Sequence, residues 1–329
     1  MKLSEFDYVL PGELIAQYPC RVREDARLMV VNRKAATITH RVFRDIGEYF
    51  DAGDLLVAND TKVRTCRLRA RRASGGKVEV LLLGKKIGAI FDALLKPARV
   101  RLGETVRFEG NGLCGQISGK NEITFNTDDE QQIYSHGDMP LPPYIKRAPE
   151  ALDRLYYQTV YAAHQGSVAA PTAGLHFTQS LLGGLQDKGV KLAYLTLHVG
   201  YATFKPVKSQ EVQDHVMEYE TFSIPESTVG MLKEAVASKK RVVAVGTTAA
   251  RALETFAGGT REGRTNLFVY PGYAFKMVDS LLTNFHLPHT TLLMLVSAFG
   301  GMALVKRAYE EAVQEKYRFY SYGDAMLII

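Results

Sequence analysis

Val242-Val-Ala-Val-Gly-Thr-Thr-Ala-Ala-Arg-Ala-Leu-Glu254 is the stretch that decides the fold class of this chain. Four consecutive apolar residues predict a short buried strand, and the Gly-Thr-Thr turn then leads into the start of a helix. Similar apolar runs at 27–32, 54–59 and 190–198 predict strands, and 178–188 reads as an amphipathic helix with Thr178 as its N-cap. Strands that alternate with helices indicate an α/β protein with a largely parallel sheet. Further helices are expected at 225–238, 248–257 and 302–316.

A different pattern interrupts this alternation after residue 62. Short apolar strands follow one another about every ten residues, with Gly-rich turns between them, which is typical of a small antiparallel barrel or sandwich. The cluster Met139-Pro-Leu-Pro-Pro143 ends this segment, because proline continues neither a helix nor a central strand. The sequence therefore predicts a main domain of residues 1–62 together with 152–329, and an inserted β domain of residues 63–151. The inserted strands are expected at 77–83, 91–95, 105–108, 113–117 and 122–125.

The composition describes an ordinary globular protein. Of 329 residues, 46% are hydrophobic and 23% are charged. The longest apolar run, Leu292 to Phe299, is far shorter than the roughly 20 residues of a membrane span. The N-terminus has acidic residues where an export signal would be apolar, and the three cysteines are widely separated. We therefore expect a cytoplasmic protein without a disulfide framework.

Positive charge is concentrated in one segment. The whole chain has a net charge of +6, but residues 60–109 contain thirteen Lys or Arg and five acidic residues, a net of +8. A basic segment on a nearly neutral body is expected where the partner is a polyanion such as nucleic acid. A solvated charged surface is the alternative, since the basic residues are interleaved with apolar strand residues.

Four polar patches lie beside apolar segments, at 169–178, 196–204, 245–251 and 283–286. Each mixes Thr with Gly, Asn, His or Arg, side chains whose donors and acceptors need partners when they are buried. Such patches predict loops that converge on a pocket. Histidine is the side chain best suited to moving protons near neutral pH, although any single histidine could serve a structural role. The candidates are His176, His198, His215 and His286, together with the carboxylates Glu218 and Glu220.

The Gly246-Thr247-Thr248 turn and Arg251 suit an anionic or carboxylate group, because a helix start presents free backbone N–H groups. An ordinary capped crossover is the alternative. The chain contains neither GxGxxG nor GxxxxGK[ST], so dinucleotide and P-loop sites are not indicated. It also lacks HExxH, and Pro288 disrupts the spacing of His286 and His289, so no metal is expected. The aromatic residues of 156–161 and 317–322 could stack nucleobases or pack in a core.

The polar patches, with several other segments, closely resemble one family: the S-adenosylmethionine:tRNA ribosyltransferase-isomerases of queuosine biosynthesis. The resemblance runs from residue 6 to about residue 322. Tyr201-Ala202 is a departure, since Leu-Gly is expected there, and Ala202 tolerates a positive φ poorly. The matching motifs lie at 6–17, 59–63, 157–161, 170–178, 197–200, 245–248 and 283–288.

This resemblance implies an unusual reaction. The ribosyl part of S-adenosylmethionine is transferred to 7-aminomethyl-7-deazaguanine at the wobble position of tRNA and isomerised. The products are epoxyqueuosine in tRNA, free adenine and free methionine. S-adenosylmethionine is then a co-substrate, no prosthetic group is needed, and the protein is expected to be a monomer. The implied fold is a split, barrel-like α/β main domain with an inserted small antiparallel β-barrel.

The same resemblance implies roles for individual residues. His176 and His286 are the expected proton movers, with His198, Glu218 and Glu220 as alternates. Thr247, Thr248 and Arg251 would hold the methionine carboxylate. The full set expected at the S-adenosylmethionine site is Asn59, Asp60, Thr172, Gly174, Phe177, Gly246, Thr247, Thr248, Arg251, Thr283, Asn284 and Phe285. The residues expected to contact tRNA are Lys62, Arg64, Arg67, Arg69, Arg71, Arg72, Lys146 and Arg147.

Two other classes of protein remain open at this point. An RNA methyltransferase would release S-adenosylhomocysteine and usually has a Gly-rich loop after its first strand, which this chain lacks. A non-catalytic RNA-binding protein would not need four histidine-containing segments.

Overall fold

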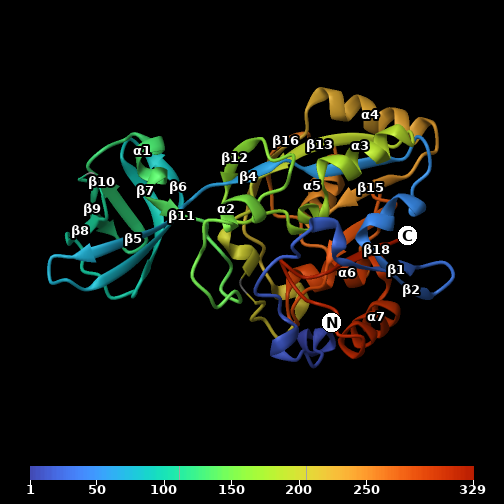
Figure 1. Cartoon of the computed structure of the whole chain (residues 1–329), viewed down its shortest axis with the longest axis horizontal. Coiled ribbons are helices and arrows are strands. Elements are labelled where there is room, and N and C mark those ends of the chain that lie inside the picture. The colour runs from blue at the N-terminus through green and yellow to red at the C-terminus, as the bar shows by residue number, and fades with distance from the viewer. Residues whose placement is uncertain (111, 205) are drawn as a thin grey trace.

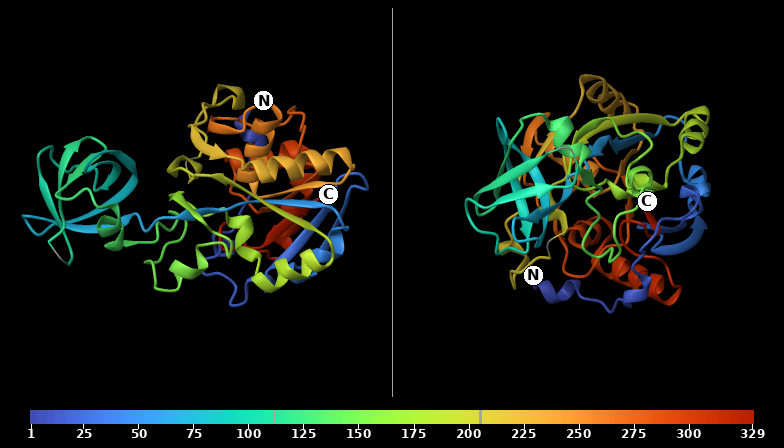
Figure 2. Two further views of the ribbon diagram at one scale, coloured as in Figure 1. Left: turned by 90° about the horizontal axis from the view of Figure 1, so that it is seen from above. Right: turned by 60° about the vertical axis from the view of Figure 1, so that its left-hand side comes forward.

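The computed structural model describes every residue of the chain except Asn111 and Lys205, and it does not describe the side chains of Ala202 and Phe204. Two bodies are visible, a large α/β body and a small β-barrel that extends from one end of it (Figures 1 and 2). The expected fold class, α/β with an inserted small antiparallel β-barrel, is confirmed. The main domain was expected to be barrel-like, but its larger sheet is open, because within the described residues the edge strands β16 and β2 do not pair with each other.

The main body is built on a nine-stranded mixed sheet with the order β16-β14-β13-β3-β15-β17-β18-β1-β2. Its centre is parallel, as expected: β13, β3, β15 and β17 run in the same direction. The outer pairs β14–β16 and β1–β2 are antiparallel. The strands are β1 (Arg27–Asn32), β2 (Thr37–Val42), β3 (Leu55–Asn59), β13 (Lys191–Leu197), β14 (Glu220–Ser223), β15 (Val242–Val245), β16 (Glu262–Thr265), β17 (Ser280–Asn284) and β18 (Ala325–Ile328).

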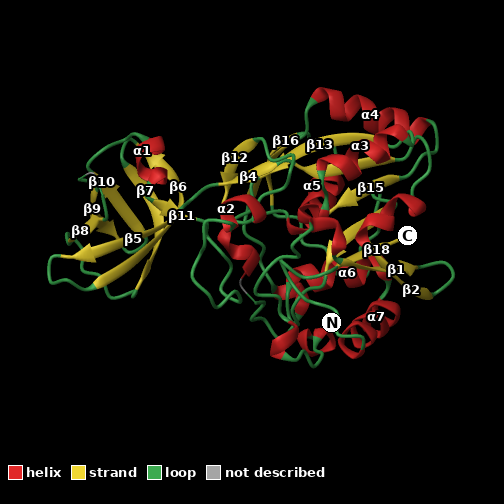
Figure 3. Ribbon diagram, in the orientation of Figure 1, coloured by secondary structure: helices red, strands yellow, loops and turns green. Residues whose placement is uncertain are grey.

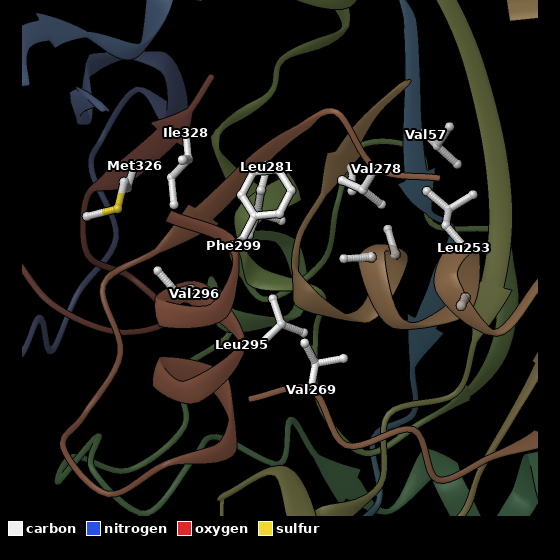
Figure 4. Packing of buried hydrophobic residues seen from close by; sticks show 14 of the residues in the cluster. Val57, Leu253, Val269, Val278, Leu281, Leu295, Val296, Phe299, Met326 and Ile328 are labelled. Atoms are coloured by element: carbon white, nitrogen blue, oxygen red, sulfur yellow. The ribbon is translucent and has the colours of Figure 1, made fainter. Parts of the chain in front are cut away.

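Helices cover both faces of this sheet (Figure 3). Alternate residues of the central strands enter opposite cores, so Val57 packs toward one layer of helices and Leu56 toward the other. In the first core, Leu281 of the sheet lies beside Phe299 of the helices, and Val57 lies near Leu253 (Figure 4). The first layer consists of α4 (Glu226–Ala237), α5 (Thr247–Ala257), α6 (Thr291–Gly300) and α7 (Met302–Gln314). The second contains α3 (Gln179–Asp187) and the 3-10 helix η4 (Phe43–Tyr49).

The helix predicted at 178–188 begins as expected. The Thr178 hydroxyl caps α3 by accepting a hydrogen bond from the Leu181 backbone N–H at 3.0 Å. Shorter helices complete the main body: α2 (Asp153–Tyr156), η1 (Leu3–Phe6), η2 (Gly12–Leu14), η3 (Arg23–Asp25), η5 (Thr172–His176), η6 (Tyr201–Phe204) and η7 (Val212–Asp214).

The barrel is closed, because β5 pairs with β8 as well as with β6. Its interior is a separate apolar core that includes Leu68, Val80, Phe91 and Ile123. The strands are β5 (Arg67–Arg72), β6 (Lys77–Ile87), β7 (Ile90–Lys96), β8 (Thr105–Phe108), β9 (Cys114–Gly119) and β10 (Glu122–Phe125), with the short β11 (Gly137–Asp138) beside β5 and helix α1 (Glu130–Ser135) after β10.

A two-stranded sheet lies where the chain passes between the bodies. Its strands, β4 (Thr61–Val63) and β12 (His164–Ser167), are parallel. The proline-rich segment after the barrel packs back on the main body, where Met139 and Leu141 contact a cluster with Val63 and Tyr157. The domain boundaries expected at residues 63 and 151 stay a prediction.

Within the described residues, no single helix has the length and apolar character of a membrane span. Helices α6 and α7 meet that criterion only as a pair, and the pair is bent by 116°.

Candidate active site

The predicted polar patches meet at one edge of the main sheet. The parallel strands β13, β3, β15 and β17 end there. His198 follows β13, Asp60 follows β3, the Gly246-Thr247-Thr248 turn follows β15, and Asn284 is the last residue of β17. Ligands of open α/β sheets bind beyond the carboxyl ends of such strands. The topology therefore places this edge at the expected position of an active site.

A polar cavity opens at this edge. Five threonines contribute to its lining, and the N-terminus of α5 faces it through Gly246, Thr247 and Thr248. Helix α5 begins without a side-chain cap, so its first N–H groups are available to a ligand. Gly246 has a φ of +89°, a conformation that favours glycine. The lining comprises Tyr144, Ala169–Ala173, Val199, Thr203, Gly246–Thr248, Thr283, Asn284, His286, Leu292, Tyr320 and Ser321.

His286 is a fixed, buried member of this lining. Its side chain is 6% exposed, and Nε2 lies 2.8 Å from the Thr283 hydroxyl oxygen. Its backbone is held on both sides, because the N–H donates to the Tyr309 hydroxyl at 3.0 Å and the carbonyl accepts from the Tyr8 hydroxyl. The imidazole is thus held in one place beside the cavity.

His176 is buried on the other side of Asn284. The Asn284 side-chain nitrogen lies 3.2 Å from His176 Nε2, and the Thr172 hydroxyl donates to Asn284 Oδ1 at 3.2 Å. Asn284 also donates to the Tyr320 carbonyl at 3.1 Å. One amide therefore joins His176 to two residues of the cavity wall, Thr172 and Tyr320.

Both histidines are neutral at physiological pH. Burial lowers the pKa of His286 to about 3. Burial also lowers the pKa of His176 to about 3, and the nearby cations Arg318 and Arg23 act in the same direction. A neutral imidazole can accept a proton at one nitrogen and donate from the other, so both residues have the form that acid–base catalysis needs.

Arg251 lies in a second, adjoining pocket, which we call the arginine pocket. The residue is 7% exposed, and its guanidinium pairs with Glu220 through Nη1 and donates through Nε to the Leu267 carbonyl at 2.9 Å. The remaining Nη2 is buried and has no hydrogen-bond partner within the described part of the chain. Glu218 and apolar residues such as Phe268 and Leu295 line the same pocket, which shares Thr203 and Leu292 with the polar cavity.

The structure separates Arg251 from the threonines with which the sequence had grouped it. Thr247 and Thr248 line the polar cavity, whereas Arg251 lies about one turn later on α5 and lines the arginine pocket. Glu220 is committed to Arg251 and to the Gly200 backbone N–H, which donates to it at 3.0 Å. His215 packs edge-on against Phe268 in the arginine pocket, and burial lowers its pKa.

His198 and Asp60 belong to a polar cluster near β4 and β12. His198 Nδ1 lies 2.8 Å from the Thr61 hydroxyl, which also lies 2.8 Å from the Ser167 hydroxyl. Asp60 accepts from the Thr196 hydroxyl at 2.7 Å and lies 3.6 Å from His164. Burial raises the pKa of Asp60 and lowers that of His198. Sequence reasoning did not single out His164, because only the pairing of β12 with β4 brings it to Asp60.

Five residues expected at the ligand line neither pocket: Asp60, described above, and the four that follow. Phe285 is fully buried among Tyr309, Tyr317 and Phe319, and Phe177 is buried against Phe43, so both rings are in the core. Asn59 is fully buried, with its amide committed to β13 and to the Thr248 hydroxyl. Gly174 is closely packed, because a Cβ there would lie 2.0 Å from the Tyr161 hydroxyl oxygen.

Most of the predicted RNA-binding cations are ion-paired. Lys62 and Lys146 have no ion pair within the described residues, and the other six do. The pairs are Arg64–Glu130 (3.2 Å), Arg67–Glu79 (3.0 Å), Arg69–Asp138 (3.0 Å), Arg71–Glu109 (3.8 Å), Arg72–Glu104 (2.6 Å) and Arg147–Asp153 (2.7 Å).

Some cavity residues had no clear signal in the sequence. Tyr144 follows the proline cluster, and its hydroxyl bonds to that of Ser321, which lies in the C-terminal aromatic segment. The sequence also predicted that Ala202 alters the backbone of its loop, but the side chain of Ala202 lies outside the described part of the structure.

Among the described residues, no group of three or more His, Cys, Asp or Glu side chains could hold a metal ion.

Comparisons with known proteins agree over the whole chain. A family described as queuosine biosynthesis protein matches residues 3–328. An S-adenosylmethionine:tRNA ribosyltransferase-isomerase from Sulfurihydrogenibium is 49% identical over 336 residues, and one from Aquifex aeolicus is 47% identical over 334, with 100% of each chain covered. The crystal structure of an S-adenosylmethionine tRNA ribosyltransferase from Thermotoga maritima covers 99% of this chain and 100% of its own, with a TM-score of 0.59 and 39% identity.

Proposed function

The chain belongs to the family of queuosine biosynthesis proteins, and on this premise we propose that its two adjoining cavities carry out ribosyl transfer from S-adenosylmethionine to tRNA. The protein is an S-adenosylmethionine:tRNA ribosyltransferase-isomerase. It transfers and isomerises the ribosyl group onto 7-aminomethyl-7-deazaguanine at the wobble position. Adenine and methionine leave, and epoxyqueuosine remains in the tRNA.

This reaction needs several proton transfers in one place. The sulfonium acidifies the adjacent 5′ C–H of the ribose, so a base can remove that proton. Adenine leaves as a neutral base only if an acid protonates it, and the tRNA amine must lose a proton to attack. An alkoxide can then expel methionine and close the epoxide. General acid–base help contributes about 10²–10⁴-fold per step.

The observation that carries the proposal is the pair of buried neutral histidines on either side of Asn284. His286 lines the polar cavity, and His176 is connected to the same cavity through Asn284. We assign His286 and His176 as the proton movers, with His198 and Glu218 as alternates. Glu220 is better suited to positioning Arg251 than to moving a proton, because it is already ion-paired.

The polar cavity suits the ribosyl group. Thr172, Thr247, Thr248 and Asn284 offer hydroxyls and an amide around its wall, and ribose hydroxyls need such partners once water is excluded. The shared Thr203 and Leu292 then connect this group to the arginine pocket.

The arginine pocket suits the methionyl end of S-adenosylmethionine. Leaving a buried N–H without a partner costs about 1–3 kcal/mol, and a carboxylate oxygen at Arg251 Nη2 would remove that cost. The apolar walls formed by Leu267, Phe268 and Leu295 would contact the methionine chain. Arg251 therefore keeps its expected role, but in a pocket separate from Thr247 and Thr248.

The cellular setting is also proposed. Cys20, Cys66 and Cys114 are all free thiols, which agrees with a reducing cytoplasm. We propose that the protein acts there as a monomer, and that residues 63–151 fold as the inserted domain.

Product analysis tests the function directly. The protein would be incubated with S-adenosylmethionine and tRNA that carries 7-aminomethyl-7-deazaguanine, and small products and digested nucleosides analysed by mass spectrometry. Free adenine, free methionine and epoxyqueuosine are expected. S-adenosylhomocysteine would instead indicate a methyltransferase, and absence of any turnover would contradict the proposal.

A further inference from the structure

A third hollow lies between the barrel and the main body, and we call it the interdomain cleft. On the barrel side it is lined by the outer face of β5, β6 and β7, including Arg67, Leu81, Leu94 and Lys96. On the other side it is lined by the proline-rich segment and by two residues of the main body, Val168 and Tyr201. Figures 1 and 2 show the barrel standing apart from the body on this connection.

The strand register explains the character of the barrel wall. Leu81 pairs with Arg67 on one side and with Leu94 on the other, so these three side chains form one row across the sheet. In the next row, Glu79 pairs with Arg69 and with Lys96. Val80 and Leu82 point into the barrel core, so Leu81 points outward. The cleft thus combines outward leucines with Lys96 and with the Arg67–Glu79 ion pair (3.0 Å), and Tyr201 adds an aromatic ring on the opposite side. An aromatic ring beside a cation is a combination that binds unpaired nucleotides.

Neighbouring residues of the same two segments line the cleft and the polar cavity. Val168 lines the cleft, and the next residues, Ala169 and Ala170, line the polar cavity. Tyr201 lines the cleft, and Thr203, in the same turn of η6, lines both the polar cavity and the arginine pocket. A base held in the cleft is therefore one turn of chain from the groups that would hold the ribosyl donor.

Charge favours one occupant for this cleft. Residues 60–109 have a net charge of +8, which complements a phosphate backbone. Of the barrel cations that have no ion pair within the described residues, Lys96 lines the cleft, whereas Lys77, Arg99, Arg101 and Arg107 lie elsewhere on the barrel and are available to flanking phosphates.

We propose that the interdomain cleft binds unpaired nucleotides of the tRNA anticodon loop and presents the wobble base to the polar cavity. This inference rests on the proposed function, and it assigns Tyr201 and Leu94 as contacts for RNA bases. Tyr201 offers an aromatic face, and Leu94 offers an apolar surface on the barrel side. Neither residue is assigned to S-adenosylmethionine.

Tyr201→Ala and Leu94→Ala test this assignment, with Tyr201→Phe as the conservative variant and Leu102→Ala as the control. Leu102 is 74% exposed on the same barrel and does not line the cleft. Loss of one base–aromatic contact weakens RNA binding roughly 5- to 150-fold. We expect Tyr201→Ala to raise both the Kd for an anticodon stem-loop and the KM for tRNA about tenfold or more. Tyr201→Phe and Leu102→Ala should stay near wild type.

Two further readouts separate this inference from the function itself. The Kd for S-adenosylmethionine alone and the thermal unfolding of each variant should stay unchanged. Equal loss of S-adenosylmethionine and RNA binding, or unchanged RNA binding in both alanine variants, would overturn the assignment of the cleft. Because stem-loop binding needs no turnover, it decides about the cleft even if the wild-type protein releases no adenine.

Discussion

At the scale of single residues, His286 is the side chain whose removal should be most informative. Its imidazole is buried, neutral and bonded to Thr283 at the wall of the polar cavity. We expect His286→Ala to lower turnover by about 10²-fold or more, because general acid–base catalysis contributes about that much. The measurement is the rate of adenine release at saturating substrates.

The control for this variant is His136→Ala, a histidine in the barrel bonded to the Gln132 carbonyl. It should keep normal turnover, and both variants should give the circular dichroism spectrum of the folded protein. A near-normal rate for His286→Ala would remove His286 from the mechanism.

Burial of the same histidines predicts how stability depends on pH. The pKa of His286 falls from 6.5 in the unfolded chain to about 3 in the folded protein. Between these values the unfolded chain binds the proton and the folded protein does not, so stability is lost as pH falls from about 6.5 toward about 3. His286→Gln removes this titrating group, so the slope of the free energy of unfolding against pH should decrease by up to ~1.4 kcal/mol per pH unit.

Urea unfolding of wild type and His286→Gln at about pH 7 and about pH 5 measures this difference. His176 and the carboxylates titrate in both proteins, so their contribution cancels in the comparison. Parallel pH profiles would contradict a neutral, buried His286.

At the scale of elements, the 3-10 helix η5 positions both Thr172 and His176. It lies close to Tyr161 because residue 174 has no side chain: a Cβ would lie 2.0 Å from the Tyr161 hydroxyl oxygen and 2.9 Å from Thr159 Cγ2. Gly174→Ala should therefore displace η5, lower stability by about 1–3 kcal/mol and reduce activity. Thermal unfolding and the rate of adenine release measure the two effects.

Gly183→Ala provides the matched control. Gly183 lies within α3, and a Cβ there would meet no atom within 4 Å. This variant should keep full activity, and its free energy of unfolding should rise by about 0.5–1 kcal/mol because alanine has a better helix propensity than glycine. Equal behaviour of the two variants would mean that the packing of η5 against Tyr161 does not matter.

Elements were predicted well where local patterns are strong. The strands 105–108 and 122–125 and the capped helix after Thr178 lie where the sequence predicts them. Strand β5 was not predicted as a strand, because four arginines hide the alternation of the buried Leu68 and Ala70. This strand closes the barrel, and only its pairing with β6 and β8 reveals it.

At the scale of the whole molecule, the basic barrel should make tRNA binding sensitive to salt. Each phosphate contact gives a slope of roughly −0.7 to −0.9 in a plot of log K against log salt concentration. Arg99 and Arg101 have no side-chain ion pair within the described residues. The double variant Arg99→Gln/Arg101→Gln should therefore reduce the magnitude of the slope of log K against log salt concentration by roughly 1–2. Binding titrations at several salt concentrations measure the slope.

Lys233→Gln, an exposed lysine on α4 of the main body, serves as the control and should leave the slope unchanged. A flat salt response of the wild-type protein would show that the barrel does not contact the RNA backbone.

The sequence by itself determined the α/β class, the inserted β-barrel and the polar patches of the site, because these depend on periodicity, turn residues and motifs that are local in the chain. Only the tertiary structure decided which polar residues act together. In the structure, Phe285 and Phe177 lie in the core, and Arg251 lies with Glu220 in a pocket separate from Thr247 and Thr248. A cleft also lies between the barrel and the main body. Those outcomes depend on strand order and on contacts between residues far apart in the chain, which no local pattern specifies.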